Sequence, residues 1–216
     1  MTDAKFEVAG ETLTLMPERA IYWERNKTLL IADPHFGKSA TFRAHGIPIP
    51  EGNLNSDLAR LTQAITRTGA DKVIVLGDLL HTVLGRDDET LGSVQMWREQ
   101  HPDLQITLVR GNHDRHAGDP PDVWQMQCVD APITKPPFVL THQPEPSADG
   151  YVLAGHLHPL ALLEGKGKQS LKLPCFWFGT EQAILPAFGS FIDGMVVRTV
   201  ATDRVFVVTP GSVQRI

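Results

Sequence analysis

The feature that most constrains this chain is a set of five short apolar, β-prone runs, each followed by residue types that bind metals. In chain order, residues 28–32 precede Asp33 and His35, residues 73–76 precede Asp78, residues 106–109 precede Asn112, His113 and Asp114, residues 138–140 precede His142, and residues 151–154 precede His156 and His158. Ligands of α/β proteins gather at the carboxyl ends of the strands. The pattern therefore predicts five buried strands that deliver these side chains to one site.

The predicted elements indicate an α/β fold in which a parallel core is followed by a β-rich half. In chain order we expect β structure over 1–32, a long loop over 36–53, a helix over 54–68, a strand over 73–76, a helix over 89–100, a strand over 105–109, and then mainly strands, over 123–128, 138–140, 151–154, 161–163, 170–177, 183–185, 195–199 and 204–208. Strand–helix alternation predicts right-handed parallel crossovers. We expect two sheets packed face to face in a single domain, residues 1–216.

Composition and charge narrow the class of protein. The net charge of −5 argues against a large basic surface for nucleic acid, although bound divalent ions would add positive charge where a phosphate must sit. The first residues lack the pattern of a signal peptide, and no apolar run approaches the roughly 20 residues that span a bilayer. Cys128 and Cys175 have no metal-type spacing. We therefore expect a cytoplasmic protein with reduced thiols and no membrane association.

The residue mix of two carboxylates, one amide and four imidazoles suits two divalent metal ions. Asp33 and His35 lie two apart, so on a strand their side chains would point the same way and could share one ion. Asp78 can bridge both ions through its two oxygens. Asn112, with His142 and His156, can complete the second site, and His158 can turn back to the first. Ions about 3.5–4 Å apart clamp a phosphate and create a hydroxide nucleophile between them.

His113 and Asp114 remain outside this ligand set, and cleavage of a phosphate ester needs further groups beside the metal ions. An alkoxide leaving group needs a proton, and the charge that develops on the phosphoryl group needs a donor. We predict that His113 supplies both and that Asp114 holds the His113 ring in place. The alternative for any one of these residues is a plain structural turn, because Gly-Asn and Gly-Asp are common turn formers. Five such segments in order favour the metal site.

These motifs resemble the signature of the calcineurin-like metallophosphoesterases. The matching segments are Asp33-x-His35, Gly77-Asp78, Gly111 to Asp114, His142, and Gly155-His156-x-His158. The resemblance implies an α/β fold, a two-sheet β-sandwich flanked by helices in four layers, and hydrolysis of phosphate esters. It also implies that the first metal takes Asp33, His35, Asp78 and His158, and the second takes Asp78, Asn112, His142 and His156.

A closer resemblance is to the bacterial ligase-associated PdeM subfamily. It is carried by residues 33–52, 76–81, 155–159, 173–176 and 185–189. That subfamily implies a manganese-dependent endonuclease for single-stranded DNA in DNA repair, found alongside a DNA ligase and a helicase. Two other hypotheses stay open: a phosphoesterase for a cyclic nucleotide, dinucleotide or nucleotide-sugar, and a scaffold that reuses the fold for binding alone. The intact ligand set argues against the scaffold.

Several residues outside the ligand set are candidates for substrate contact. The wider family often has an acidic residue three positions after the bridging Asp, where this chain has His81, which either contacts substrate phosphate or hydrogen-bonds a ligand. Lys38, Arg43, Arg86 and Arg115 follow the motifs and could contact a DNA backbone. Phe36 and Phe42 could stack on unpaired bases, with core packing the alternative for Phe36. A basic hairpin could extend the surface that contacts the DNA backbone or could be a soluble turn; its lysines are Lys166, Lys168 and Lys172.

Overall fold

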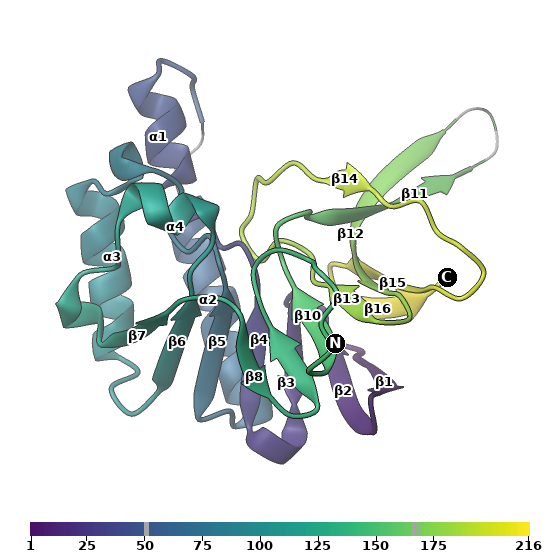
Figure 1. The fold of residues 1–216 in the computed structure, drawn as a ribbon. Helices are drawn as coiled ribbons and strands as arrows, with labels where there is room; N and C mark the ends of the chain where they lie inside the picture. The colour runs from purple at the N-terminus through teal and green to yellow at the C-terminus, as the bar shows by residue number, and fades with distance from the viewer. Residues whose placement is uncertain (50–51, 166, 168) are drawn as a thin grey trace.

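The computed structural model describes residues 1–49, 52–165, 167 and 169–216. Over these residues the strands form two sheets that pack against each other, with helices on the outer face of the first sheet (Figure 1). The predicted α/β two-sheet sandwich with flanking helices is confirmed. Helices α1 to α4 of the described residues lie on the side of the first sheet.

The first sheet joins an antiparallel half to a parallel half. Its seven strands in the described residues, in both chain and spatial order, are β1 (Ala4–Val8), β2 (Glu11–Met16), β3 (Ala20–Trp23), β4 (Thr28–Ile31), β5 (Lys72–Leu76), β6 (Gln105–Val109) and β7 (Met126–Val129). Strands β1 to β4 pair antiparallel, and β4 to β7 pair parallel. The parallel half therefore brings the carboxyl ends of β4, β5 and β6 to one edge, as predicted.

The second sheet is mixed and contains the β-rich half of the chain. Its strands are β8 (Ile133–Lys135), β9 (Phe138–Leu140), β10 (Tyr151–Ala154), β11 (Pro159–Glu164), β12 (Ser170–Phe178), β13 (Gln182–Ile184), β14 (Met195–Val196), β15 (Arg204–Thr209) and β16 (Ser212–Arg215). Strand β10 lies parallel to both β9 and β13. The carboxyl ends of β9 and β10 consequently meet the same edge of the molecule as β4, β5 and β6.

Alternation along the central strands divides the core into two layers. In β4, Leu29 and Ile31 face the helices, whereas Leu30 faces the second sheet, where Phe138 and Phe176 meet it. All five side chains are almost fully buried. Burial of one such side chain is worth about 1.5–3 kcal/mol relative to exposure, so the two layers together supply most of the drive to form the sandwich.

The helices differ in one important respect from the prediction. The structure has α1 (Lys38–Ala44), α2 (Asn53–Thr68), α3 (Asp88–Glu99) and α4 (Asn112–Ala117), with short 3₁₀ turns η1 (Glu24–Asn26), η2 (Val83–Gly85) and η3 (Asp122–Trp124). Helices α2 and α3 agree with the prediction, and Gly69 ends α2 in the left-handed conformation. Helix α1 lies inside the stretch predicted to be loop, because no glycine or proline interrupts residues 38–44.

Smaller differences are found in the strands. Strands β8 and β16 were not predicted, and the strand expected over 195–199 is only β14. Helix α4 occupies the motif that was expected to be a turn. Each of these elements is short, and short elements depend on tertiary partners more than on local pattern.

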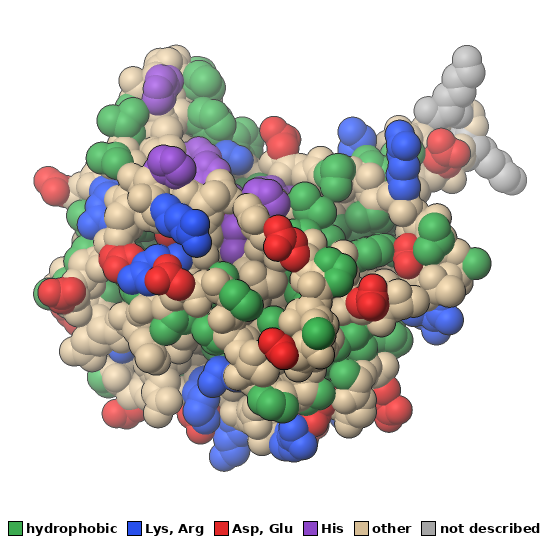
Figure 2. Space-filling model, in the orientation of Figure 1, with side chains coloured by type: hydrophobic (Ala, Val, Ile, Leu, Met, Phe, Trp, Pro, Cys, Tyr) green, Lys and Arg blue, Asp and Glu red, His purple; other side chains and the backbone are tan. Residues whose placement is uncertain are grey.

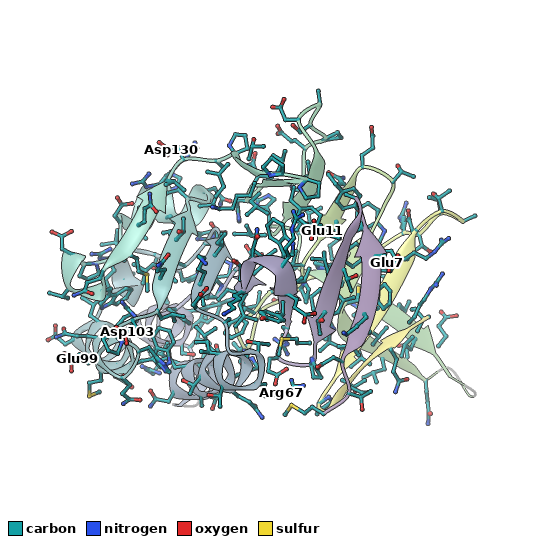
Figure 3. All side chains as sticks on the ribbon, turned by 90° about the horizontal axis from the view of Figure 1, so that it is seen from below. Glu7, Glu11, Arg67, Glu99, Asp103 and Asp130 are labelled. Atoms are coloured by element: carbon teal, nitrogen blue, oxygen red, sulfur yellow. The ribbon has the colours of Figure 1, made fainter. Side chains whose placement is uncertain are left out.

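One ion cluster ties the end of α2 to the N-terminal strands (Figure 3). The Arg67 guanidinium bonds both oxygens of Glu18, at 2.6 and 2.7 Å, and both oxygens of Asp3, at 2.9 Å. Glu18 is 1% exposed, and the Arg67 guanidinium compensates its buried charge by contacting both carboxylate oxygens. This cluster joins α2 to the turn between β2 and β3 and to the start of the chain, and it is structural.

The histidines gather where the surface dips between the α1 side of the molecule and the β11–β12 hairpin (Figure 2). None of the helices within the described residues has the length and apolar character needed to cross a bilayer.

Candidate active site

The loops that follow β4 and β5 run side by side and place their acidic residues together. The backbone N–H of Asp33 donates to the carbonyl oxygen of Gly77 at 3.2 Å, and the N–H of His35 donates to the carbonyl oxygen of Asp78 at 2.9 Å. Both carboxylates are buried, at 0% exposed for Asp33 and 2% for Asp78. Two buried carboxylates without a nearby salt-bridging Arg or Lys, within the part of the chain described, call for another cation.

All seven ligand candidates lie beyond the strands, and five of them have left-handed backbone. The φ angles are +52° for Asp33, +47° for His35, +54° for Asp78, +71° for His156 and +46° for His158. The argument that Asp33 and His35 share a direction because they alternate on a strand is therefore wrong, although the two residues do meet. Asp, Asn and His tolerate this region better than other side chains, and such strain concentrates at functional sites.

Glycines inside the motifs make room for the ligands of neighbouring motifs. A Cβ on Gly77 would lie 2.2 Å from Nδ1 of His142, and a Cβ on Gly111 would lie 2.2 Å from Oδ1 of Asp78. On Gly155 it would lie 2.6 Å from Oδ2 of Asp33. Each glycine is thus a spacer against a ligand from another strand, which explains why the motifs read Gly-Asp, Gly-Asn-His-Asp and Gly-His-x-His.

Asp33, His35 and His158 form the first cluster of ligand-type side chains, with atoms within 4.8 Å of one another. Nε2 of His158 lies 3.6 Å from Oδ1 of Asp33, and both atoms are buried with no hydrogen-bond partner among the described residues. Nε2 of His35 lies 3.8 Å from Oδ2 of Asp78. Orphaned buried atoms of this kind, one anionic and one with a lone pair, fit a divalent cation between them.

Asp78, His142 and His156 form the second cluster, and Asn112 joins it. Nε2 of His142 lies 2.9 Å from Oδ1 of Asn112, 3.4 Å from Oδ2 of Asp78 and 3.0 Å from Nδ1 of His156. Nδ1 of His142 donates to the carbonyl oxygen of Leu76 at 3.0 Å, which leaves the Nε2 lone pair facing the cluster. That arrangement is typical of a metal ligand whose other nitrogen is held by the backbone.

Burial dominates the pKa shifts of His35 and Asp78, whereas at His158 the neighbouring Asp33 carboxylate outweighs burial and raises the pKa. Burial, with the rings of His158 and His113 nearby, lowers the pKa of His35 to about 2, so its ring is neutral. Burial also raises the pKa of Asp78 to about 6. Metal ligands must be neutral imidazoles and ionised carboxylates. In type and placement the residues fit two divalent ions, with Asp78 near ligand-type atoms of both clusters, and such ions would supply Lewis-acid activation of a phosphate ester.

His113 lies at the rim of the two clusters, on α4. Its Nε2 is 4.0 Å from Oδ2 of Asp78, and its side chain is 34% exposed. The prediction that Asp114 holds this ring is wrong. The Asp114 carboxylate points inward and accepts backbone N–H groups of Gly111, Asp78, Leu79 and Leu80. Successive residues on a helix point in different directions, so Asp114 braces the Asp78 loop while the His113 ring bonds the carbonyl oxygen of His81 instead.

His81 contacts two rings of the site. Its Nδ1 lies 3.3 Å from Nδ1 of His35, and its ring stacks on that of His113 with centroids 5.1 Å apart and an interplanar angle of 17°. Burial and the neighbouring His113 lower the pKa of His81 to about 4. His81 therefore contacts His35, a candidate ligand, and also lines a surface pocket together with Asn112 and His113.

The predicted phosphate-contacting cations differ in their surroundings. Arg115 is exposed and borders a pocket of about 180 Å³ that Asn112 and His142 also line. Arg43 forms an ion pair with Glu89 at 3.3 Å. Lys38 is half-buried, with its ammonium 5.7 Å from the centre of the Phe42 ring. Of these three cations, Arg115 is therefore the one that shares a pocket with the second cluster and has no ion pair among the described residues.

The remaining sequence candidates fall into three groups. Arg86 donates to the carbonyl oxygens of residues 117–119, which is a structural role. Phe36 is 4% exposed and belongs to the core, so it cannot stack on bases, whereas Phe42 is partly exposed and meets Phe191 edge-on at 6.3 Å. Lys166 and Lys168 lie outside the described residues. Lys172 is on the exposed part of β12.

Sequence reasoning missed the backbone groups that orient the ligands. The carbonyl oxygens of Leu76, His81 and Asp193 accept from His142, His113 and His158, the last at 2.9 Å. The contacts of a backbone carbonyl oxygen cannot be predicted from residue types. The spacer glycines can be recognised in the sequence, because each directly precedes the candidate ligand of its motif.

Comparison with known proteins agrees with this site. Residues 27–157 match the calcineurin-like phosphoesterase family. The crystal structure of the nuclease MPE of Pseudomonas putida is 37% identical, with a TM-score of 0.87 and 100% of both chains covered. Yfce, a phosphoesterase from E. coli, is 15% identical over 88% of this chain and 97% of its own, with a TM-score of 0.44. No curated protein sequence matches the chain.

Proposed function

This chain belongs to the calcineurin-like phosphoesterases and is a metal-dependent phosphoesterase, and we propose that it is a single-stranded DNA endonuclease that uses two manganese ions. The observation that carries the proposal is the convergence of seven ligand-type side chains at one edge of the sandwich. The substrate class is supported by the 37% identity to a nuclease over the whole chain. Oxygen and imidazole ligands suit Mn²⁺ but also iron, zinc and cobalt, so manganese rests on the subfamily resemblance.

In this proposal each cluster holds one ion and Asp78 serves both. Asp33, His35 and His158 hold the first ion, and Asn112, His142 and His156 hold the second. When bound, the ions would polarise the phosphate and activate a water molecule for attack on phosphorus. The protein's own residues fix the geometry, because His142 and His158 are each locked by a backbone carbonyl.

His113 is proposed to act on the leaving group. Its ring is held through Nδ1, so Nε2 is the atom that faces the reacting phosphate. A protonated Nε2 can donate to the leaving oxygen as the P–O bond breaks, so that the product departs as an alcohol. Arg115, at the rim of the second cluster, is proposed to position the strand through a phosphate, a contact without sequence information.

The cellular setting is also part of the proposal. We infer that the enzyme acts in the cytoplasm in DNA repair, in association with a DNA ligase and a helicase, and that residues 1–216 work as one domain. Support comes from the subfamily resemblance, from the two free thiols, and from a nuclease structure that matches both chains over their full length.

The test uses two circular DNAs of the same sequence, one single-stranded and one duplex. The purified protein is stripped of metal, supplied with Mn²⁺ and incubated with each circle. Fragmentation of the single-stranded circle, with the duplex spared and an Asp78→Ala variant inactive, is the expected result. Intact circles together with rapid hydrolysis of a small model diester would indicate that the substrate is instead a small molecule, such as a cyclic nucleotide, dinucleotide or nucleotide-sugar.

A further inference from the structure

An apolar groove of about 500 Å³ lies on the second sheet, and Leu157 and Pro159, which flank His158 in the sequence, are among the residues that line it. Its walls come from β14, from the ends of β12 and β13, and from Leu157, which separates the ligands His156 and His158 in the sequence. Met195 on β14 is 52% exposed there. The proposed mechanism uses none of these residues except as neighbours of His158.

The groove is joined to the ligand loop by hydrogen bonds. The backbone N–H of Met195 donates to the carbonyl oxygens of Leu157 and His158, at 3.4 and 3.2 Å. Two residues earlier, the carbonyl oxygen of Asp193 accepts from Nδ1 of His158. One wall of the groove is thus the same segment that orients His158, so the groove and the first cluster share one stretch of chain.

Three side chains give the groove its chemistry. Trp177 lines it with a partly exposed ring, held by a bond from Nε1 to Oδ2 of Asp203 at 3.0 Å, whereas the other three tryptophans are buried. Gln182 also lines it, and its Oε1 is buried without a hydrogen-bond partner among the described residues. The exposed Arg198 stands at its edge.

We propose that this groove binds an unpaired nucleobase of the strand whose phosphate lies at the metal clusters, with Trp177 as the stacking surface. The proposal rests on the proposed function and deepens it by naming the contact that selects single strands. A base has an aromatic face for Trp177 and Met195, and it has polar edges for the amide of Gln182, which can turn to offer either its oxygen or its NH₂ group. The attached backbone phosphate complements Arg198. A paired base is stacked inside a duplex and cannot enter.

The experiment compares two single strands of equal length, an oligothymidylate and a strand of abasic residues with the same backbone. Cleavage by the manganese-loaded full chain gives kcat and KM for each. Stacking of one base on an aromatic ring accounts for a factor of about 10 to 100 in affinity. The wild type should therefore cut the oligothymidylate with a kcat/KM about 10-fold or more above that for the abasic strand.

Variants locate the effect in the groove. Trp177→Ala should raise KM for the oligothymidylate about 10-fold or more and leave the abasic strand unchanged, whereas Trp177→Phe should keep most of the preference. Met195→Gln tests the groove without touching the aromatic ring, and it should weaken the preference. Its matched control is Met96→Gln, because Met96 is also exposed, at 59%, but lies on α3 away from the groove.

The outcomes separate the two proposals. If the wild type cuts both strands equally well, the endonuclease stands and the base-binding groove is overturned. Equal losses on both strands for Trp177→Ala and Met195→Gln would also overturn it, because the groove would then be structural. If the wild type cuts neither strand but hydrolyses a small diester, the endonuclease proposal fails and the groove proposal fails with it.

Discussion

Nδ1 of His113 lies 2.6 Å from the carbonyl oxygen of His81, a backbone group on the loop that also carries Asp78. Since a carbonyl can only accept, Nδ1 carries the proton, and Nε2 is left to face the two clusters. The ring stack between His113 and His81 fixes the plane in which Nε2 lies. One loop therefore positions both the proposed bridging carboxylate and the proposed acid.

Replacing His113 by Ala should slow hydrolysis of a diester with an alkyl leaving group by about 10²- to 10⁴-fold, the usual contribution of a general acid. A p-nitrophenyl leaving group needs no proton, so its hydrolysis should fall far less. The measurement is kcat/KM on the two diesters for the variant, the wild type and a His45→Ala control, which changes an exposed histidine at the end of α1. Equal losses on both diesters would contradict the acid role.

Replacing Asp114 by Asn tests its role as a brace. The carboxylate accepts four backbone N–H groups, and an amide can accept through one oxygen only while its NH₂ would face the others. Leaving a buried donor unsatisfied costs about 1–3 kcal/mol. We expect a lower Tm and weaker metal binding, and equal loss of activity on alkyl and aryl diesters.

The control for this variant is Asp119→Asn, which changes a more exposed carboxylate paired with Arg110. It should leave metal binding intact. An Asp114→Asn protein with normal stability that loses activity only on alkyl diesters would restore the original assignment, in which Asp114 acts through His113.

The sequence predicted the strands and the ligand candidates because both leave a local mark. Val73, Ile74 and Val75 are β-branched and Leu76 is apolar, whereas Gly77 and Asp78 break the pattern of a buried strand. The order of five such segments was enough to expect one site at one sheet edge. The sandwich followed from the family resemblance and from the loss of helix signals in the second half.

What could not be predicted depends on contacts that are distant in the sequence. The inward turn of Asp114 is set by N–H groups of residues 78–80, more than 30 positions away. The left-handed backbone at Asp33 and His35 is set by pairing with the loop after β5. One wall of the groove at Trp177 comes from β14, which is placed by its pairing with β11. None of these is visible in hydrophobic periodicity.

Replacing Gly111 by Ala should disrupt the site through steric crowding. Backbone strain is not involved, because Gly111 has a φ of −94°, which other residues also adopt. The new methyl group would lie 2.2 Å from Oδ1 of Asp78 and must push the carboxylate away. We expect loss of most activity and of metal-induced stabilisation. Gly92→Ala on α3, where a Cβ meets nothing within 4 Å, is the matched control and should raise stability by about 0.5–1 kcal/mol. Comparable activity in the two variants would contradict the spacer role.

The gain in stability on metal binding should grow as the pH rises, because Asp78 must lose its proton to bind the metal. Burial raises its pKa to about 6 in the folded, metal-free protein, above the value of about 3.9 in an unfolded chain. The unfolded state therefore releases this proton first, and the metal-free protein loses stability as the pH rises from about 4 to 6. A divalent ion binds the ionised carboxylate and compensates for its burial, so protons compete with metal at low pH.

The measurement is Tm with Mn²⁺ and with a chelator, at pH 5 and at pH 7.5. The rise in Tm on adding Mn²⁺ should be clearly larger at pH 7.5. In the chelator, Asp78→Asn should be more stable than the wild type at pH 7.5, and the difference should be smaller at pH 5, because the amide removes a buried charge but can still accept the N–H of His113. It should also abolish the Mn²⁺ effect at both pH values. A wild-type Tm rise that is the same at both pH values would show that Asp78 does not exchange a proton for the metal.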